Sequence, residues 1–262
     1  MIKALFTAAT GMQAQEMNIN VIANNMANVN TTGFKKSRAE FQDLMYQTLV
    51  EPGSSTSEST STPSGIQVGL GVKPAATKKV FTQGDLTSTG NQLDMAIEGD
   101  GFFQVNMPDG TSAYTRSGAF QLDENGQFVT SDGFVLQPPI TVPADALSVS
   151  IGQDGIVSIL QPGSPTPTEA GQIQLTRFQN PGGLKSIGKN LFVETQSSGA
   201  PSIGNAGENE FGRIIQSFLE SSNVSVVEEV VTMIQAQKAY EASSKAITTA
   251  DEMSSQALSL KR

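Results

Sequence analysis

Apolar side chains recur at coiled-coil spacing at both ends of this 262-residue chain. The N-terminal series alternates steps of three and four residues, is interrupted only by Glu16, and comprises Ile2, Leu5, Ala9, Met12, Ile19, Ala23 and Met26. The C-terminal series repeats every seven residues at Val226, Met233, Tyr240 and Ile247, with Val230, Ala236, Ala250 and Ala257 on the same face. Both patterns predict long helices with one apolar seam. Each seam needs a partner, so the ends either pair with each other or are buried by other copies of the chain.

The first helix is expected to run from Ile2 to about Asn28. Asn28, Asn30 and Gly33 end it, because Asn and Gly tolerate the left-handed backbone that closes a helix. A short amphipathic stretch follows at residues 41–49, and we expect it to add one or two helical turns.

The second helix is expected to begin at Val226 and to continue toward Leu258. Ser225 is the predicted N-cap, and Glu228 three residues later completes a capping box. Residues 214–219 are then a strand or an approach segment rather than part of the helix.

The segment 51–65 contains nine Ser or Thr residues and no apolar side chain. It cannot build a core of its own. We interpret it either as a flexible linker or as an extended loop that becomes ordered against a neighbouring subunit.

The middle of the chain, from about Ile66 to Glu210, alternates short β-branched or aromatic runs with turn signals. Four Asx-Gly pairs, typical of β-hairpins, are Asp109-Gly110, Asn125-Gly126, Asp132-Gly133 and Asp154-Gly155. The expected strands are residues 94–97, 102–105, 113–115, 120–122, 128–130, 135–137, 148–151, 157–160, 172–178 and 190–194. The predicted fold is α+β, with discontinuous terminal coiled-coil helices and a central antiparallel β domain, divided at residues 1–50, 51–65, 66–210 and 211–262.

Composition excludes several kinds of chemistry. Cys and His are absent, which removes disulfides, Cys-rich zinc sites and His-activated nucleophiles. An enzyme would depend on carboxylates alone, and a glycosidase acting on peptidoglycan would need two of them about 5–9 Å apart. No such pair stands out, so we expect no catalytic residue, no cofactor and no metal.

The net charge of −9 lies in the middle of the chain: residues 1–50, 51–210 and 211–262 carry +1, −9 and −1. The nearly neutral ends can therefore crowd against like copies without strong repulsion. No basic patch suits nucleic acid, and no apolar run approaches the roughly 20 residues that span a bilayer. We therefore expect no nucleic-acid partner and no membrane insertion, and we find no cleavable signal peptide.

Four sequence blocks resemble motifs of one family, the flagellar rod and hook axial proteins. They are residues 23–36 (ANNMANVNTTGFKK), 96–103 (AIEGDGFF), 114–137 (YTRSGAFQLDENGQFVTSDGFVLQ) and 222–241 (SNVSVVEEVVTMIQAQKAYE). The blocks occur in the family's order and extend over most of the chain. Within the family, the length and the Ser/Thr-rich insert after Leu49 resemble the distal rod members.

The resemblance implies a structural subunit without enzymatic activity. Such a subunit would be exported unfolded by the flagellar type III apparatus and would polymerise into the distal rod, which crosses the periplasm and carries torque from motor to hook. The implied partners are other copies of the chain, proximal rod and hook proteins, the surrounding ring proteins and the export apparatus. The alternatives are a proximal rod or short hook-like protein and, in another class, a monomeric secreted β-domain adhesin whose terminal helices pair with each other.

The predicted subunit interface combines both seams with the Asn-rich end of the first helix. It comprises Ile2, Leu5, Ala9, Met12, Ile19, Ala23, Asn24, Asn25, Met26, Asn28, Val226, Val230, Met233, Tyr240 and Ile247. The Asn residues could instead only cap one helix. Because the seams lack partners in a free monomer, we also expect residues 1–60 and 225–262 to be largely disordered until assembly.

Overall fold

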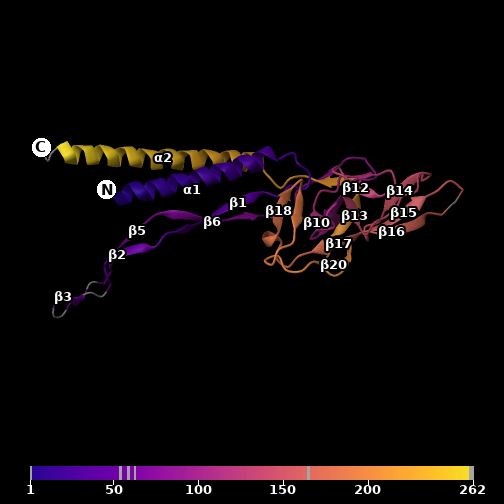
Figure 1. Ribbon diagram of the computed structural model, residues 1–262, viewed down its shortest axis with the longest axis horizontal. Helices are drawn as coiled ribbons and strands as arrows, with labels where there is room; N and C mark the ends of the chain where they lie inside the picture. The colour runs from indigo at the N-terminus through magenta and orange to yellow at the C-terminus, as the bar shows by residue number, and fades with distance from the viewer. Residues whose placement is uncertain (1, 53–54, 58–59, 62, 164–165, 260–262) are drawn as a thin grey trace. The chain divides into compact units, whose positions relative to one another are not determined.

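The computed structural model describes residues 2–52, 55–57, 60–61, 63–163 and 166–259 (Figure 1). The chain forms two compact units, each built from separated stretches of sequence. Unit 1 consists of residues 1–26, 37–78 and 225–262, and unit 2 consists of residues 27–36 and 79–224. The chain therefore passes between the units four times.

Two long helices dominate unit 1, as the heptad patterns predicted. Helix α1 is Ile2–Ala27 and helix α2 is Val226–Ser259, and they lie side by side (Figure 1). They run antiparallel, because Asn25 near the end of α1 contacts Glu229 near the start of α2, whereas Gly11 lies against Ser243. The α+β class is confirmed, and both helices begin at the predicted residue.

Paired strands complete unit 1. They are β1 (Ser37–Asp43) with β6 (Val72–Lys79), β2 (Tyr46–Val50) with β5 (Ile66–Gly69), and β3 (Ser55–Ser57) with β4 (Thr60–Ser61). The expected helical turns at residues 41–49 are therefore wrong. The backbone groups of β2 bond to residues 66–69, a distant partner that the local apolar spacing could not reveal.

The insert at residues 51–65 contains the short pair β3–β4, in which Ser55 is opposite Ser61 and Ser57 is opposite Thr60. Its remaining positions 53–54, 58–59 and 62 lie outside the described residues. The contacts that this insert makes with other subunits therefore stay a prediction.

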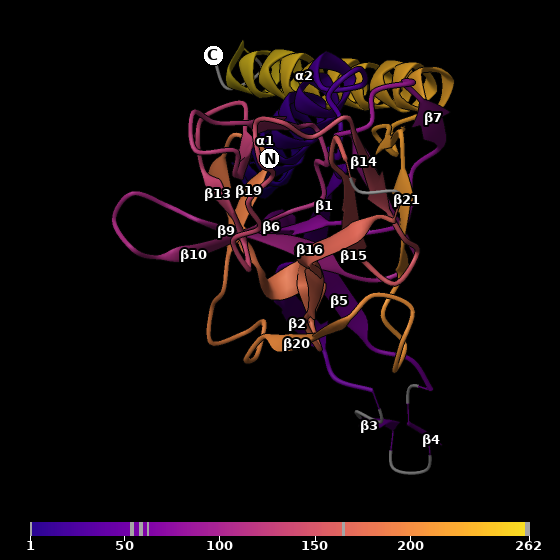
Figure 2. The same cartoon turned by 90° about the vertical axis from the view of Figure 1, so that its right-hand side faces the viewer.

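Unit 2 is an antiparallel β structure (Figure 2). Its largest sheet has the order β11-β12-β13-β9-β10-β19-β18, with β17 pairing both β9 and β20; the smaller sheets are β14-β15-β16, β8-β21 and β7-β22. The strands are β7 (Leu86–Ser88), β8 (Met95–Glu98), β9 (Phe102–Asn106), β10 (Ser112–Thr115), β11 (Phe120–Leu122), β12 (Phe128–Thr130), β13 (Val135–Gln137), β14 (Ser148–Ile151), β15 (Ile156–Leu160), β16 (Thr168–Gln172), β17 (Gln174–Arg177), β18 (Lys185–Gly188), β19 (Leu191–Val193), β20 (Ser202–Asn205), β21 (Arg213–Gln216) and β22 (Phe218–Glu220), and a 3-10 turn covers Pro181–Gly183.

The strand pairing moves the expected boundaries of the β domain. Strands β5 and β6 pair with β2 and β1, so residues 66–78 belong to unit 1. Strands β21 and β22 pair with β8 and β7, so residues 211–224 belong to unit 2. The structure thus divides the chain at 78/79 and 224/225 instead of 65/66 and 210/211.

All four Asx-Gly pairs form hairpin turns, between β9 and β10, β11 and β12, β12 and β13, and β14 and β15. Gly110, Gly126, Gly133 and Gly155 have φ values of 80°, 75°, 84° and 83°. This left-handed conformation strains any residue with a Cβ atom, which explains why glycine follows the Asx residue.

The core of unit 2 has two parts that share strand β9. Phe103 packs in the main cluster with Phe120 and Leu136. Its neighbour Phe102 points to the other face of the strand, as successive residues do, and joins an aromatic cluster with Phe178. Both faces of β9 are therefore buried, which makes this strand the centre of the unit.

Candidate assembly surface

Helices α1 and α2 meet through small side chains. Ala14 on α1 and Ala236 and Ala250 on α2 are buried, and a Cβ atom at Gly11 would lie 3.4 Å from Oγ of Ser243. Small residues bring two helix backbones close together but bury little apolar area. The intrachain contact of α1 and α2 therefore leaves most of the large apolar side chains of these helices outside it.

One polar group fixes the end of this helix pair. The buried Asn25 amide donates from Nδ2 to the Ser37 carbonyl at 2.8 Å and accepts from the Ser37 N–H at Oδ1, also at 2.8 Å. Nδ2 also donates to Oε2 of the buried Glu229 at 3.3 Å. Asn25 was predicted as a subunit contact, and the structure places its amide in contacts within its own chain.

The predicted seam of α1 lies on a different face from the buried one. Ala14, Ile22 and Asn25 are buried, whereas Ala23 is exposed and Ile19 is only half-buried. At about 3.6 residues per turn, the two faces are roughly two-fifths of a turn apart. The pairing of α1 with α2 therefore does not bury the heptad seam of α1.

The predicted interface residues differ in exposure within the single chain. Ala23, Asn24, Val226, Val230 and Tyr240 are exposed; Leu5, Ala9, Met12, Ile19, Met26, Asn28, Met233 and Ile247 are half-buried; Asn25 is buried; the side chain of Ile2 lies outside the description. The seven-residue repeat of α2 runs along the border of its buried face. That these residues form the interface between subunits remains a proposal.

An exposed apolar stripe on the first turns of α2 was only partly found from the sequence. It comprises Val226, Val227, Val230, Val231 and Ile234, of which Val227 is 74% exposed. We call this set the α2 stripe. The heptad pattern included Val226 and Val230 but not the other three residues of the stripe. The apolar run VVEEVV at residues 226–231 is the sequence feature that could have indicated Val227 and Val231.

The ribbon β2–β5 carries a second set of exposed apolar side chains in unit 1. Its members are Met45, Tyr46, Leu49, Ile66 and Val68, and Met45 is 83% exposed. Exposed apolar side chains of this size are found where another protein binds. Among the described residues of unit 1, neither the α2 stripe nor these ribbon side chains are buried.

Three of the family-like motifs meet around a buried ion cluster in unit 2. Glu220 accepts a charged hydrogen bond from Nζ of Lys35 at 2.5 Å and another from Nε of Arg116 at 2.9 Å, and all three side chains are at most 5% exposed. Nη1 of Arg116 also donates to the carbonyls of Gly99 and Gly101. No sequence pattern indicated this cluster, because Lys35 and Arg116 lie 185 and 104 positions from Glu220 in the chain.

Burial lowers the pKa of Lys35 from its ordinary value, and attraction to the Glu220 carboxylate partly opposes this shift. The Lys35 ammonium also donates to the Thr82 carbonyl at 2.7 Å, so its hydrogen bonds are provided by the protein. A buried ion cluster of this kind orients its segments. It ties residues 33–36 to the β strands without exposing a reactive group.

The neighbouring glycine makes this arrangement possible. Gly33 has a φ of 69°, and a Cβ atom there would lie 2.5 Å from the Ser117 N atom. Only glycine allows residues 33–36 to approach the segment that carries Arg116 so closely. The Thr-Gly-Phe-Lys motif therefore has a structural explanation inside unit 2.

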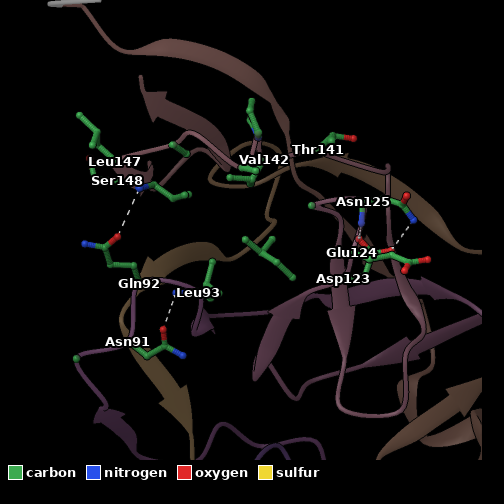
Figure 3. A pocket seen from close by; sticks show the side chains of 17 residues that line it. Asn91, Gln92, Leu93, Asp123, Glu124, Asn125, Thr141, Val142, Leu147 and Ser148 are labelled. Carbon is green, nitrogen blue, oxygen red and sulfur yellow. Dashed lines mark hydrogen bonds between the residues drawn. The ribbon is translucent and has the colours of Figure 1, made fainter. Parts of the chain in front are cut away.

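A groove of about 730 Å³ opens on unit 2 between residues 90–93, 122–126 and 141–149 (Figure 3). Asp123 and Glu124 lie on one side of it, and Leu93 and Leu147 lie on the other. Hydrogen bonds from the Gln127 and Asn125 backbones hold the pKa of the Asp123 carboxyl below its usual range. These two carboxylates come from adjacent turn positions and do not face each other across a reaction site.

Metal-ligand clusters of three or more acidic side chains do not occur among the residues that the structure describes. Within the same residues, no helix is long and apolar enough to cross a membrane. The surfaces that stand out in the described structure are thus apolar ones suited to other protein chains.

Comparisons with known proteins identify the family. Three family models match in order: "Flagella basal body rod protein" at residues 5–35, "Flagellar hook protein FlgE/F/G D1 domain" at 96–159 and "Flagellar basal body rod FlgEFG protein C-terminal" at 215–260. The flagellar basal-body rod protein FlgG of Borreliella burgdorferi is 52% identical over the full length of both chains. The chain belongs to the FlgG family of flagellar basal-body rod proteins.

Other relatives show how much of the chain is shared. FlgG of Buchnera aphidicola subsp. Baizongia pistaciae is 52% identical over 97% of each chain. The flagellar hook protein FlgE of Helicobacter mustelae is 44% identical over 52% of this chain, which corresponds to 30% of the hook protein. The likeness to FlgG proteins therefore includes both units, whereas the likeness to this hook protein covers about half of the chain.

Proposed function

We propose that this chain is a structural subunit that polymerises with copies of itself into the distal rod of the bacterial flagellar basal body. In this role it transmits torque from the motor to the hook across the periplasm. One observation carries the proposal: unit 1 exposes the α2 stripe and the apolar ribbon β2–β5 in a chain of the basal-body rod family. An isolated rod subunit has these surfaces open, and neighbouring copies cover them.

The physical basis is burial of apolar surface between long helices. Each square ångström removed from water contributes about 25 cal/mol, and the α2 stripe presents five branched side chains within nine residues. A contact between two different surfaces of the same chain repeats without closing, which produces a helical filament. Many such contacts per subunit make a shaft stiff.

The remaining parts of the proposal concern partners and chemistry. The ends of the shaft contact proximal rod and hook proteins, its outer surface faces the ring proteins, and the subunit reaches its place through the type III export apparatus. The absence of Cys suits passage through a narrow export channel in an unfolded state. The role is mechanical and requires no catalytic group.

Adding charge to the α2 stripe tests the assembly. We expect the double variant Val227→Lys/Val231→Lys to remain folded but to fail to polymerise, because each ammonium would be buried in the contact between subunits. The matched control is Gln235→Lys/Gln237→Lys, which adds the same two positive charges to exposed positions of the same helix outside the stripe. Electron microscopy of concentrated protein is the readout, and equally long polymers of the double variant and the control would contradict the proposal.

The alternative is a secreted adhesin that stays monomeric, with α1 and α2 as a closed pair. Analytical ultracentrifugation of the unmodified chain at rising concentration distinguishes the two. An adhesin would sediment as a monomer throughout with both helices folded, whereas a rod subunit forms polymers above a threshold concentration. Hydrogen exchange in the same sample decides between two expectations for the dilute monomer: the disordered terminal segments expected from the sequence, and the paired helices α1 and α2 of the single-chain structure.

The insert at residues 51–65 provides a finer test. We expect a chain lacking these residues to polymerise into shafts that are more curved or more flexible, because the insert is proposed to contact neighbouring subunits. Curvature measured on micrographs is the readout. Shafts as straight as those of the full chain would remove the stiffening role from this segment.

A further inference from the structure

The groove on unit 2 combines apolar and acidic groups on its surface. Leu147 is 67% exposed and Leu122 is 37% exposed, and both line the groove. Asp123 and Glu124 line it as well, and the exposed Asp145 lies between two further lining residues. None of these described lining residues is basic, so the groove suits an occupant with an apolar side chain next to a positive charge.

Strand β18 presents that combination on the same unit. It is the last strand of the large sheet, and all four of its residues, Lys185–Gly188, are exposed. The pairing with β19 shifts between Ser186 and Gly188, which leaves Ile187 as the extra residue of a β-bulge. A bulge turns its side chain away from the regular sheet, and Ile187 is 44% exposed.

Lys185 supplies the positive charge two residues before Ile187. Within the described part of the chain it takes part in no ion pair, whereas Arg177 and Lys189 are paired with Glu210 and Asp132. The outer edge of β18 has no partner strand in the sheet order, and an edge of this kind with an exposed apolar residue is a place where another chain can bind. Lys185 and Ile187 together are called the β18 knob below.

We propose that the β18 knob of one copy docks into the acidic groove of the next copy. This inference rests on the proposed function, because it adds a second contact between subunits of the same polymer. Ile187 packs between Leu122 and Leu147, and the Lys185 ammonium faces the carboxylates of Glu124 and Asp145. The occupant of the groove is thus a second copy of this chain.

The sheet order makes this contact extend instead of closing. Leu122 ends β11 at one edge of the large sheet, and β18 forms the opposite edge. A knob at one edge and a groove at the other are different surfaces, so each copy can offer its knob to one neighbour and its groove to another. The contact therefore gives a chain of copies, in the same way as the helical contacts proposed for unit 1.

Cysteine cross-linking tests the contact directly, because the chain contains no Cys of its own. We expect the double variant Leu147→Cys/Ile187→Cys, polymerised and treated with a short bis-maleimide, to give a ladder of dimers, trimers and longer products. The dilute monomer should give none, which separates contacts between copies from links within one chain. The control pair Leu147→Cys/Ile203→Cys places the second thiol on an exposed Ile of β20 and should give no ladder.

A charge exchange tests the pairing independently. Lys185→Glu and Glu124→Lys should each raise the concentration needed for polymerisation about tenfold, because like charges then face each other in the contact. The double exchange Lys185→Glu/Glu124→Lys should return that concentration to near the original value. Additive losses in the double variant would contradict the pairing.

The outcomes separate this inference from the proposed function. If polymers of the single variant Leu147→Cys form but its thiol stays fully reactive toward a maleimide probe, the groove is not covered by another copy and the inference fails alone. If single Leu147→Cys chains link to each other as dimers only, the contact is symmetric and the knob is not its partner. If the unmodified chain forms no polymer at any concentration, the proposed function fails and the inference fails with it.

Discussion

Units 1 and 2 differ in where they keep their apolar side chains. Among the described residues, unit 1 buries only four apolar side chains, Ala14, Ile22, Ala236 and Ala250, and exposes the α2 stripe. Unit 2 buries a large aromatic and aliphatic core around Phe103. Burial of apolar surface is the main source of folding stability. Unit 2 therefore contains the means of its own stability, whereas unit 1 leaves much of its apolar surface exposed, where we propose that other copies bind.

The largest effect is expected in unit 2, from removing the anion of its ion cluster. Glu220→Gln leaves Lys35 and Arg116 as buried cations without a counter-charge, which should lower the free energy of unfolding by about 3–5 kcal/mol. The matched control is Glu210→Gln, whose pair with Arg177 is exposed and is worth about 0–1 kcal/mol. Chemical denaturation followed by circular dichroism gives both values. Similar losses in the two variants would mean that the ion cluster does not stabilise unit 2.

The next effect separates the two faces of α1. Ile22→Ala should lower the stability of the helix pair by about 2 kcal/mol, because it empties part of a small core. Ile19→Ala should cost less in the monomer, since Ile19 is only half-buried, but more in the polymer. Hydrogen exchange of the α1 amides is the measurement in each state. Equal exchange in the two variants, in both states, would remove the distinction between an inner and an outer face.

That exchange experiment also tests the independence of the units. The amides of β9 in unit 2 should keep their protection in Ile22→Ala, because the core around Phe103 does not include this residue. If β9 lost protection together with α1, the two units would unfold as one, and the contrast between them would not describe their stability.

A loss of similar size is expected at Asn25. Asn25→Ala leaves the Ser37 N–H and the buried Glu229 without this partner, at a cost of about 1–3 kcal/mol. The control Asn20→Ala changes an exposed Asn of the same helix. Thermal unfolding measured at 222 nm compares the two. If both variants unfold alike, Asn25 does not fix the end of the helix pair.

The smallest effect concerns pH. The pKa of Asp123 lies below its usual range because backbone and side-chain hydrogen bonds favour the ionised form. The stabilisation is therefore complete above the ordinary pKa of the unfolded carboxyl and is lost as the pH falls through the lower folded value. Asp123→Asn removes this carboxyl group. The free energy of unfolding of unit 2 should then change slightly less with pH across the range in which carboxyl groups titrate, from about pH 5 to about pH 3. An unchanged acid profile would show that this turn contributes nothing measurable.

The sequence predicted local features well and distant contacts poorly. The start of α2 after Ser225 and the turn at Asn125-Gly126 depend on neighbouring residues, and both are confirmed. Residues 46–50 form a strand because residues 66–69 pair with them, and no local pattern contains that information. Strands β16, β18 and β20 were missed for a related reason: they are rich in Gly, Ser and Thr and are held by their neighbours.

The candidate site shows the same limit. Heptad spacing identified the apolar character of both helices, yet it could not tell which face the chain uses internally, because that depends on the small residues at Gly11, Ala14 and Ala236. The ion cluster around Glu220 joins residues far apart in sequence. Buried charges follow no periodic pattern, so only the three-dimensional structure reveals them.

Both termini belong to unit 1, and all of unit 2 lies between them in the sequence. A protein with this connectivity can gain residues in the middle of its chain while the first and last helices keep their partner and their register. The size of unit 2 can then change without altering the helical contacts that we propose between copies. A single pattern of terminal helices can in this way be shared by subunits of different size.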